Sequence, residues 1–435
     1  MTSNKRKNTV ANKKKSTIAN KKKNTVANKR KNTVANKKKS TVTNKKKSTI
    51  ANKKKNTVAN KKKNTVANKK KNTVANKKKN NCTLFVPTNG AGLGHLTRCL
   101  AIARRLRKLD PDREIIFFST SAAMNLILKE GFLGYHIPSQ MICGKHVKSG
   151  DWNSMFQEHL RRIIKLHQPN LLFFDGVYPY AGLITSMRET KGLKKVWMRR
   201  GLGKKVRPEV DKKEKEFDMI IVPKELFIPQ EEQKTGKHYY SNPIIYLEKS
   251  ELLNRESLRK KWKVPEDHKL VFVSLGAGNI NNINPTISKI LTVLRKRKDI
   301  SIVISESIIG KRLQIPEQEN LIIIRDYPIS SYYHAFDLAI TASGYNSFHE
   351  LLFFNVPAII IPNQMTKTDN QVARALSAEK SGAALVIKNE SILEIEKAIN
   401  MALEPQRQLL MKNTTQKLIY KNGADDVARL LKNFF

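Results

Sequence analysis

The chain has 435 residues and a formal net charge of +47, which comes from 83 Lys or Arg set against 36 Asp or Glu. Most of that excess is local, because residues 1–80 hold 30 basic and no acidic residues. The remaining residues carry +17, which suits phosphate-bearing substrates or an anionic membrane surface. Three cysteines without a CxxC pair exclude a disulfide framework. No apolar run of about 18 residues and no signal-peptide core is present, so we expect a cytoplasmic protein, free or peripheral at the inner membrane face.

Residues 1–81 form a low-complexity polybasic tail. Its unit is close to Lys-Lys-Lys-Asn-Thr-Val-Ala-Asn and recurs about ten times with a period of eight. On a helix, eight residues advance by roughly 800°, so successive valines rotate by roughly 80° and make no apolar stripe. In a β-solenoid, the lysine triplets would stack on one another. One Val or Ile in eight residues cannot offset the entropy of ordering, so we expect a disordered tail.

Two interpretations of the tail remain open. It is either a neutral expansion of a short coding repeat or a non-specific polybasic tether for an anionic membrane or nucleic acid. Proteins that bind single-stranded nucleic acid usually interleave aromatic side chains for base stacking, and the tail has none. The composition therefore slightly favours a membrane tether, or no function, over nucleic-acid binding.

After residue 81, strand and helix patterns alternate. Residues 83–87 form an apolar run, a glycine-rich turn follows at 89–94, and an amphipathic helix comes next. One face of that helix is apolar and its charges lie elsewhere: Leu96, Leu100, Ala103 and Leu106 against Arg98, Arg104, Arg105 and Lys108. Later apolar runs predict further strands at 114–118, 171–174, 195–198 and 219–222.

The same order restarts near residue 269. Apolar runs there predict strands at 270–275, 300–305, 321–324, 338–341, 358–361 and 384–387. Such alternation predicts an α/β protein with two Rossmann-like domains, each a parallel sheet covered on both faces. We place the N-terminal domain at 82–245 and the C-terminal domain at 246–420. We expect a closing helix at 421–435 to pack back on the first domain.

Three features of the first domain could carry chemistry. Gly90, Gly92 and Gly94 stand between a strand and its helix, where a ligand can approach the backbone at a helix N-terminus. His95 follows at the carboxyl edge of the sheet, where an imidazole can accept the proton of an attacking hydroxyl. Asp175 ends another strand at this edge and can orient His95 or be the base itself. The alternatives are a plain turn, a capping or packed histidine, and an Asx turn; the glycine spacing is not that of a dinucleotide site.

The second domain contains a turn rich in small residues after the strand at 338–341. Backbone N–H groups and hydroxyls there can surround a diphosphate, from Ser343, Gly344, Asn346 and Ser347. Glu350, about two helical turns further on, can accept hydrogen bonds from two ribose hydroxyls. Other candidate donor contacts lie in a second glycine loop and a polar loop: Gly276, Gly278, Asn279, Gln364, Asp369 and Gln371. An ordinary polar surface loop is the alternative for the last three.

Two further motifs are open to more than one interpretation. Arg199 and Arg200 follow a strand and can face a phosphate or an acidic acceptor, although an ordinary surface position explains them equally well. Residues 110–112 read Asp-Pro-Asp, formally the Asp-x-Asp motif of metal-dependent diphosphate sites. They stand in a proline turn before a strand, at the opposite edge of the sheet from His95. We therefore expect no metal site.

The second domain resembles the donor domain of glycosyltransferase family 28, a family that includes the peptidoglycan lipid-intermediate N-acetylglucosaminyltransferase. The family motif has a Ser-Gly pair, a Glu seven residues after the Ser, then Gly-x-Pro and a polar loop with Gln and Asp. Ser343, Gly344 and Glu350 match at that spacing, and residues 355–357 read Asn-Val-Pro. The polar loop is about one residue longer than in the family, so its Gln and Asp residues match only approximately.

The rest of the resemblance runs over about residues 82–420 and excludes the tail. The loop with His95 is similar to the acceptor-side loop of the family, and Gly276-Ala277-Gly278 is similar to its second glycine loop near the donor diphosphate. A group of bacterial family-28-like proteins shares further segments, among them Arg-Arg-Gly at 199–201 and Phe-Asp-Gly at 174–176.

The resemblance implies a GT-B fold, in which two Rossmann-like domains face a cleft. It implies an inverting, metal-independent transfer of a hexose or N-acetylhexosamine from a UDP-sugar to an acceptor hydroxyl. No cofactor is implied, because helix dipoles and backbone donors neutralise the leaving diphosphate. The acceptor stays open as a glycan, a lipid-linked or a small-molecule hydroxyl. Two alternatives remain: a sugar-nucleotide 2-epimerase or hydrolase, and a non-catalytic polybasic binding protein.

Overall fold

The computed structural model describes residues 81–88, 90, 92–200, 208–228, 236–316, 318–366, 368–418 and 421–434. These residues belong to one compact unit. The polybasic tail is predicted at residues 1–81, and residues 1–80 of it lie outside the described residues.

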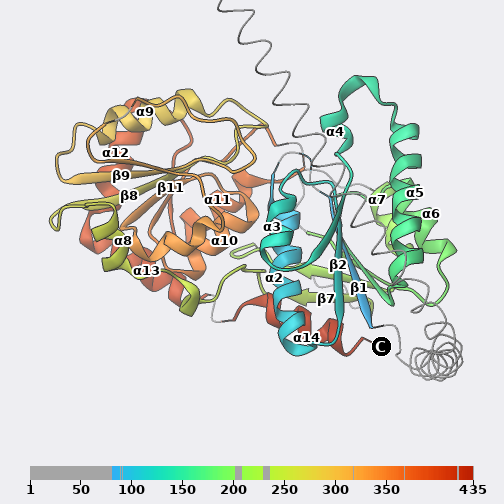
Figure 1. Cartoon of the computed structure of the whole chain (residues 1–435). Helices are drawn as coiled ribbons and strands as arrows, with labels where there is room; N and C mark the ends of the chain where they lie inside the picture. The colour runs from blue at the N-terminus through green and yellow to red at the C-terminus, as the bar shows by residue number, and fades with distance from the viewer. Residues whose placement is uncertain are drawn as a thin grey trace, which may run out of the picture. The chain divides into compact units, whose positions relative to one another are not determined.

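The first lobe is built on a seven-stranded parallel sheet with the strand order β3-β2-β1-β4-β5-β6-β7 (Figure 1). The strands are β1 (Cys82–Pro87), β2 (Glu114–Ser119), β3 (Leu133–His136), β4 (Leu171–Asp175), β5 (Lys194–Met198), β6 (Met219–Pro223) and β7 (His238–Ser241). All six residues of β1 are buried, as expected for a parallel strand covered on both faces. The chain changes direction across the sheet beside β1, because β2 and β4 flank it on opposite sides. Open α/β sheets bind ligands at such a switch point.

Helices cover both faces of this sheet. They are α2 (Gly94–Leu109), α3 (Met124–Lys129), α4 (Gln140–Cys143), η1 (Gly144–His146), α5 (Ser149–His167), α6 (Ala181–Glu189), α7 (Pro208–Asp211) and η2 (Lys212–Glu216). Side chains of a strand point alternately to its two faces. Phe85 accordingly joins the core under α2, whereas Leu84 and Val86 join Trp152 and Phe156 of α5.

The second lobe repeats this plan with a six-stranded parallel sheet, in the order β10-β9-β8-β11-β12-β13. The strands are β8 (Lys269–Ser274), β9 (Ile300–Ser305), β10 (Leu321–Ile324), β11 (Leu338–Thr341), β12 (Ala358–Ile360) and β13 (Leu385–Val386). Its helices are η3 (Lys249–Glu251), α8 (Arg255–Lys261), α9 (Asn284–Leu294), η4 (Ile329–Ala335), α10 (Tyr345–Phe353), α11 (Gln371–Ser381), α12 (Ile392–Leu403) and α13 (Pro405–Gln416), and the chain then continues into α14 (Gly423–Lys432). The switch point of this sheet lies beside β8, because β9 and β11 flank that strand on opposite sides.

The last helix, α14, packs against α2 of the first lobe (Figure 1). Lys432 Nζ donates to the carbonyl of Leu109 at the end of α2, at 2.9 Å. At the other end of α14, Gly423 N–H donates to Pro243 O at 2.9 Å. An added Cβ on Gly423 would meet the Asn242 carbonyl oxygen at 1.9 Å, so only glycine fits this contact.

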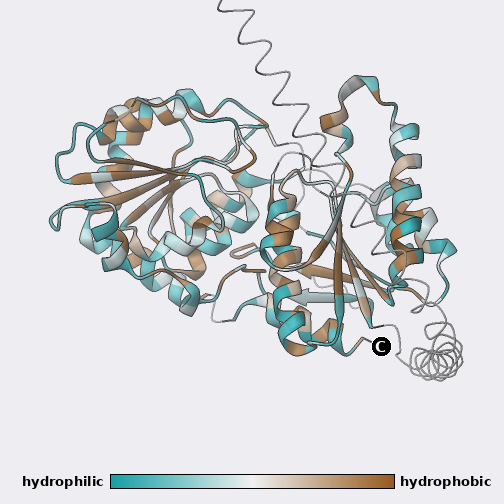
Figure 2. Ribbon diagram, in the orientation of Figure 1, coloured by the Kyte–Doolittle hydropathy of each residue, from teal (hydrophilic) through white to brown (hydrophobic). Residues whose placement is uncertain are grey.

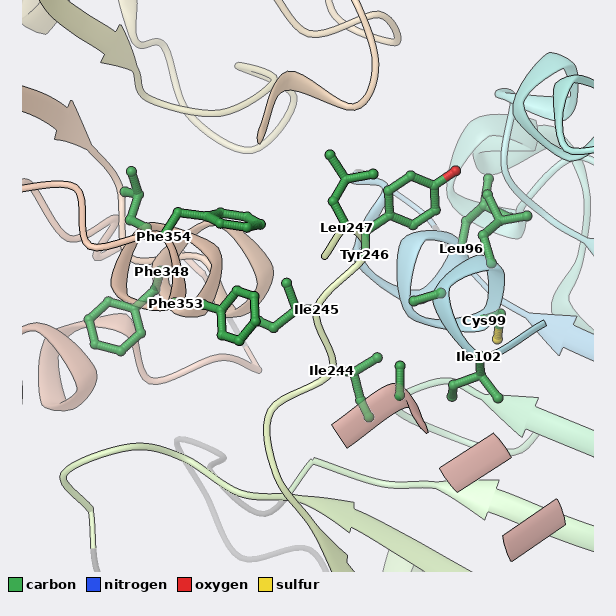
Figure 3. Close-up of a cluster of buried hydrophobic side chains, with 14 of the residues drawn as sticks. Leu96, Cys99, Ile102, Ile244, Ile245, Tyr246, Leu247, Phe348, Phe353 and Phe354 are labelled. Atoms are coloured by element: carbon green, nitrogen blue, oxygen red, sulfur yellow. The ribbon is translucent and has the colours of Figure 1, made fainter. Parts of the chain in front are cut away.

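The segment that connects the two sheets is itself part of the core. Ile244, Ile245, Tyr246 and Leu247 are all buried, and they lie between α2 and α10 in Figure 3. Leu96, Cys99 and Ile102 of α2 and Phe348 and Phe353 of α10 belong to the same hydrophobic cluster (Figure 3). The helix that carries His95 and the helix that carries Glu350 therefore share one core.

The predicted α/β fold class with two Rossmann-like sheets is confirmed, and the strands predicted from apolar runs are present. Two strands, β3 and β7, are not predicted by the sequence. Both lie at an edge of the first sheet and most of their residues are partly exposed. Figure 2 shows the central strands as hydrophobic and β7 as hydrophilic, so an apolar-run criterion misses it.

Candidate active site

A cavity of about 580 Å³ is lined by both switch points. From the first lobe it takes residues that follow β1, β4 and β5, and the first turn of α2. From the second lobe it takes residues that follow β8, β9 and β11, and the first turns of α10 and α11. The carboxyl ends of parallel strands and the N-termini of helices thus surround one space, which suits a negatively charged ligand.

His95 and Asp175 meet at the first-lobe wall of this cavity. The strand register brings them together, because Pro87 at the end of β1 pairs with Asp175 at the end of β4. His95 Nδ1 lies 2.6 Å from Asp175 Oδ1. Asp175 is fully buried, whereas 15% of the His95 side chain is exposed. The imidazole is therefore the member of the pair that a ligand in the cavity can reach.

A third side chain, Arg98, completes this cluster. Its Nε donates to Asp175 Oδ2 at 3.0 Å and its Nη2 donates to Asp175 Oδ1 at 2.7 Å. Arg98 Nη2 also lies 2.9 Å from His95 Nδ1. An ionised carboxylate can only accept, so the shorter contact of His95 is satisfied when Nδ1 carries the proton. The lone pair of the neutral ring is then on Nε2.

The charges of this cluster favour that assignment. Burial alone would raise the pKa of Asp175, but the Arg98 charge and the hydrogen bonds from His95 and Arg98 outweigh it and lower the pKa. Burial lowers the pKa of His95; Asp175 opposes this effect, while the positive charges of Arg98 and Arg200 add to it. The site therefore holds an ionised carboxylate beside a neutral imidazole, the protonation states that a general base requires.

The second-lobe wall is formed by the turn before α10. Gly344 is the N-cap of this helix, and because glycine has no side chain, no N-cap side chain binds the first N–H groups of α10. Gly344, Asn346 and Ser347 line the cavity. Gly276, in the loop after β8, also lines it and has φ of 94°, a conformation that favours glycine. Backbone donors and a helix N-terminus are the elements with which proteins bind a diphosphate.

Glu350 lies one turn further along α10. Only 6% of this residue is exposed, and burial raises the pKa of its carboxyl to about 8, although a hydrogen bond from the Tyr246 backbone partly opposes the shift. The same residue lines the cavity. A buried carboxyl that faces a polar cavity is a candidate to bind ligand hydroxyls, because such bonds would satisfy its ionised form.

Asp369 lines the cavity within a buried ionic cluster. Arg374 Nη2 donates to Asp369 Oδ1 at 2.9 Å, and Arg200 Nη1 donates to the same oxygen at 3.2 Å. Arg374 also binds both carboxylate oxygens of Glu225, at 2.6 and 2.7 Å. The side chains of Arg374 and Glu225 are completely buried. Because Glu225 and Arg200 follow strands of the first lobe, these bonds join the two lobes beside the cavity.

The cavity gathers most of the residues that the sequence singles out. The lining residues among them are Gly90, Gly92, Gly94, His95, Gly276, Gly344, Asn346, Ser347, Glu350, Asp369 and Gln371. The predicted residues that are described but are not part of its lining are Asp175, Gly278, Asn279, Ser343, Gln364 and Arg199. Asp175 supports His95 from behind, and Ser343 Oγ donates to the Gln371 carbonyl at 2.9 Å. Their roles in binding and catalysis stay predictions.

The two adjacent arginines after β5 lie in different surroundings. Arg199 forms ion pairs with Asp211 and Glu214, away from the lining residues. Arg200 lines the cavity, and burial lowers its pKa while Asp369 opposes that shift. Asp110 of the Asp-x-Asp motif lies at the end of α2, where Arg113 Nε donates to it at 2.9 Å.

Sequence patterns do not reveal Arg98 or Glu225 as members of the site. Arg98 stands one helical turn after His95, and residues three apart share a face of a helix. That spacing is a usable signal, but the apolar stripe of α2 does not predict that Arg98 is only 2% exposed. Glu225 follows a strand end, yet its partner Arg374 is 149 residues away.

Comparisons with known proteins agree with this geometry. Residues 270–430 match the glycosyltransferase family 28 C-terminal domain. A curated relative from Acetivibrio thermocellus is 24% identical over 370 residues, which cover 80% of this chain and 96% of the relative. One from Thermosipho africanus is 26% identical over 340 residues, with coverages of 72% and 88%. Both are UDP-N-acetylglucosamine--N-acetylmuramyl-(pentapeptide) pyrophosphoryl-undecaprenol N-acetylglucosamine transferases.

Solved structures give the same fold. The glycotransferase of kitacinnamycin superposes with a TM-score of 0.60 at 17% identity, and covers 81% of this chain and 98% of its own. MurG of Acinetobacter baumannii superposes with a TM-score of 0.55 at 15% identity, with coverages of 81% and 99%.

Two parallel α/β lobes whose switch points line one cavity define the GT-B class of glycosyltransferases. Within that class, the second lobe matches the glycosyltransferase family 28 C-terminal domain over residues 270–430. The chain is a glycosyltransferase with distant homology to the N-acetylglucosamine transferases of the family.

No helix in the described part of the chain is both long and apolar enough to cross a membrane. No group of three or more His, Cys, Asp or Glu side chains there is arranged to hold a metal ion.

Proposed function

We propose that this enzyme transfers a hexose or N-acetylhexosamine from a UDP-sugar to an acceptor hydroxyl, with inversion at the anomeric carbon and without a metal ion. The observation that carries the proposal is the pairing of His95 with Asp175 on one wall of the cavity, opposite the turn before α10 and Glu350. A proton acceptor and a nucleotide-binding wall thereby share one space.

In the proposed reaction, His95 Nε2 removes the proton of the acceptor hydroxyl. The hydroxyl oxygen forms a bond to the anomeric carbon, and the bond from that carbon to the diphosphate breaks. The electron pair of the broken bond leaves with UDP. Asp175 stabilises the imidazolium that forms, since its carboxylate accepts the Nδ1 hydrogen bond at 2.6 Å. A single displacement of this kind inverts the anomeric centre.

The donor is proposed to bind mainly to the second lobe. The diphosphate would lie at the N-terminus of α10 and against the glycine loop at Gly276, where backbone N–H groups and the helix dipole offset its charge. The ribose hydroxyls would donate to Glu350. The positive side chain of Arg200 also lines the cavity and can approach the leaving UDP from the first lobe.

The acceptor is proposed to enter beside the glycine loop of the first lobe. Helix α4 borders that loop, and the Met141 side chain lies against Gly90. Met141 and Ile142 are exposed by 61% and 56%. Exposed apolar side chains beside a site for a hydroxyl fit an acceptor with an apolar part, such as a lipid-linked saccharide. The names of the curated relatives make UDP-N-acetylglucosamine the first donor to test.

The proposal is tested with the enzyme, a panel of UDP-sugars and a panel of glycan, lipid-linked and small-molecule acceptors. The expected result is donor-dependent glycosylation of an acceptor with release of UDP, lost in His95→Ala. Incubation of each donor without an acceptor separates the alternatives. Epimerised or hydrolysed donor formed at the full rate without acceptor favours an epimerase or hydrolase. Binding of no UDP-sugar contradicts the proposed function.

The polybasic tail is proposed to act as a non-specific tether to an anionic membrane or nucleic acid, independent of catalysis. Its 30 basic residues support electrostatic attraction to a polyanion.

A further inference from the structure

Arg98 is a charged side chain buried at the centre of the proposed active site. It is 2% exposed, and its guanidinium contacts three other groups of the site. Nε and Nη2 each donate to one oxygen of Asp175, at 3.0 and 2.7 Å. Nη1 donates to Asn346 Oδ1 of the second lobe at 3.3 Å. A planar fork that binds both oxygens of a carboxylate fixes its orientation as well as its charge.

We propose that Arg98 is a positioning residue that keeps Asp175 as the acceptor of the His95 Nδ1 hydrogen bond, and so presents an unprotonated His95 Nε2 to the acceptor hydroxyl. This inference rests on the proposed function, because it assumes that His95 is the base. It adds a residue and a physical role that the histidine–carboxylate pair alone does not supply.

The physical argument concerns the charge of the imidazole. A buried carboxylate beside a histidine favours the imidazolium, and a histidine that is already protonated cannot act as a base. Arg98 places an opposing positive charge with Nη2 only 2.9 Å from His95 Nδ1. The guanidinium therefore neutralises the charge of Asp175, and its own positive charge disfavours protonation of the His95 ring. Asp175 can then orient His95 without holding it protonated in the resting enzyme.

The charged groups that face His95 come from three elements. Arg98 is on its own helix, Asp175 is at the end of β4, and Arg200 follows β5. Both arginines lower the pKa of His95 and Asp175 raises it, with burial as the largest influence. Arg98 is the only one of the two arginines that binds Asp175 within the described chain.

Arg98 also connects the base to the donor lobe. Asn346, in the first turn of α10, accepts from Arg98 through Oδ1 and donates through Nδ2 to the Gly94 carbonyl at 3.1 Å. The Arg98 guanidinium lies 5.5 Å from the ring centroid of Tyr345. The first turn of α10 thus contacts both Arg98 and the first residue of α2. A shift of that turn would therefore move Arg98, which holds Asp175 in position against His95.

The direct test is an NMR titration of the His95 ring in the full chain without substrate. Imidazole carbon–proton spectra are recorded against pH for the native enzyme, Arg98→Gln and Arg107→Gln, and the His95 signal is identified by its loss in His95→Gln. Arg107 is on the same helix, is exposed, and donates to the Glu130 carbonyl at 2.5 Å. It is a matched control for loss of an arginine from α2.

Removal of the Arg98 charge is expected to raise the pKa of His95 by roughly one unit or more, since close charge pairs shift pKa values by roughly 1–3 units. Arg107→Gln is expected to leave the titration unchanged. An equal titration of His95 in all three proteins overturns the inference. Because no transfer is measured, this result is independent of whether the enzyme glycosylates any acceptor.

Kinetics give the second readout. In Arg98→Gln, the acid limb of the kcat/KM profile is expected to move to higher pH by the same interval, so activity lost at neutral pH is regained on the alkaline side. A uniform loss at every pH would indicate a structural role and contradict the inference. If the native enzyme transfers no sugar yet His95 titrates as expected, only the proposed function fails.

Arg98→Lys covers the case in which Arg98→Gln does not fold. The ammonium keeps the charge but cannot bind both oxygens of Asp175 and reach Asn346 together. We expect kcat to fall while the KM for the donor stays near its native value. A native kcat in this variant would overturn the inference.

Discussion

The two lobes share a topology but differ in the chemistry at their switch points. In the first lobe, the ends of β1 and β4 bring together ionisable side chains, His95 and Asp175, with Arg98 beside them. In the second lobe, the ends of β8 and β11 present glycines, small polar residues and a helix N-terminus, with Glu350 behind them. Groups that exchange protons are suited to reaction, whereas backbone donors of fixed geometry are suited to binding. Under the proposed function, the base lies on the first lobe and the nucleotide binds mainly to the second.

The largest expected effect is the loss of transfer activity when the proposed base on the first-lobe wall is removed. His95→Ala should lower the transfer rate by roughly a hundredfold to ten-thousandfold, the usual contribution of a general base. UDP affinity should stay within a few-fold of native, because the proposed nucleotide contacts lie mainly on the second lobe. Initial rates with saturating donor and calorimetry with UDP check the two halves of this prediction. Full activity in a folded His95→Ala enzyme would show that His95 is not the general base.

The next effect concerns the bonds that join the lobes. Glu225→Gln leaves the buried guanidinium of Arg374 without its charged, two-oxygen partner. Removing one partner of a buried ion pair typically costs about 3–5 kcal/mol when the other charge is left unpaired, and a smaller loss is expected here because Arg374 keeps its bonds to Asp369. Chemical denaturation should show that loss in the free energy of unfolding.

The matched control for this change is Glu189→Gln. Glu189 pairs with Arg161 at 2.5 Å on the surface, with 46% and 45% of the two side chains exposed. Water and salt screen such a pair, so little change in stability is expected. Equal changes in the free energy of unfolding for the two substitutions would show that the buried ion pair stabilises the protein no more than an exposed one.

A smaller effect, on the affinity for UDP, is expected from a substitution on the second-lobe wall. Glu350→Gln should weaken UDP binding by roughly tenfold to a hundredfold, because hydrogen bonds to a charged group contribute about 1.5–3 kcal/mol. The turnover rate at saturating donor should fall much less than in His95→Ala. A native affinity for UDP in this variant would separate Glu350 from ribose binding.

The pH dependence of donor binding also tests whether the carboxylate of Glu350 contacts the ribose. Burial raises the pKa of Glu350 to about 8, so without bound nucleotide the carboxyl is mainly protonated at neutral pH. Ribose hydroxyls that donate to the carboxylate favour its ionised form, so binding should release a proton. Affinity for a UDP-sugar should therefore rise with pH until it passes the pKa of Glu350 and then level off. Calorimetry in buffers of different ionisation enthalpy measures the proton release, which Glu350→Gln should abolish.

The smallest effect on catalysis is expected from the tail. An enzyme that begins at Asn81 should keep the native kcat/KM for a water-soluble donor and acceptor. The full chain should bind vesicles that contain phosphatidylserine in a salt-sensitive manner, and the shortened chain should not. Equal vesicle binding by the two forms would exclude the tail as a membrane tether, and an otherwise inert tail supports the neutral-expansion interpretation.

The sequence predicts the centre of each sheet better than its edges. Strands such as β1 and β8 are buried on both faces, so they read as unbroken apolar runs. The edge strands β3 and β7 carry Gly134, His238 and three tyrosines at partly exposed positions, and their strand character depends on a neighbouring strand. A local pattern cannot contain that information.

The same limit applies to the candidate site. His95 and Asp175 can be predicted as neighbours, because both follow strands whose carboxyl ends share an edge. Arg98 is 77 residues from Asp175, and its hydrogen bonds depend on the final side-chain geometry. The meeting of Arg374 with Glu225 needs the docking of two lobes, which no spacing in the sequence encodes.

The most direct measurement is a crystal structure of the enzyme with UDP. We expect the ribose hydroxyls to donate to Glu350 and the diphosphate to lie at the turn from Gly344 to Ser347, while His95 makes no contact with the nucleotide and faces the rest of the cavity. UDP bound to the glycine loop at Gly90–Gly94, with Glu350 free of it, would contradict the division between a catalytic lobe and a nucleotide lobe.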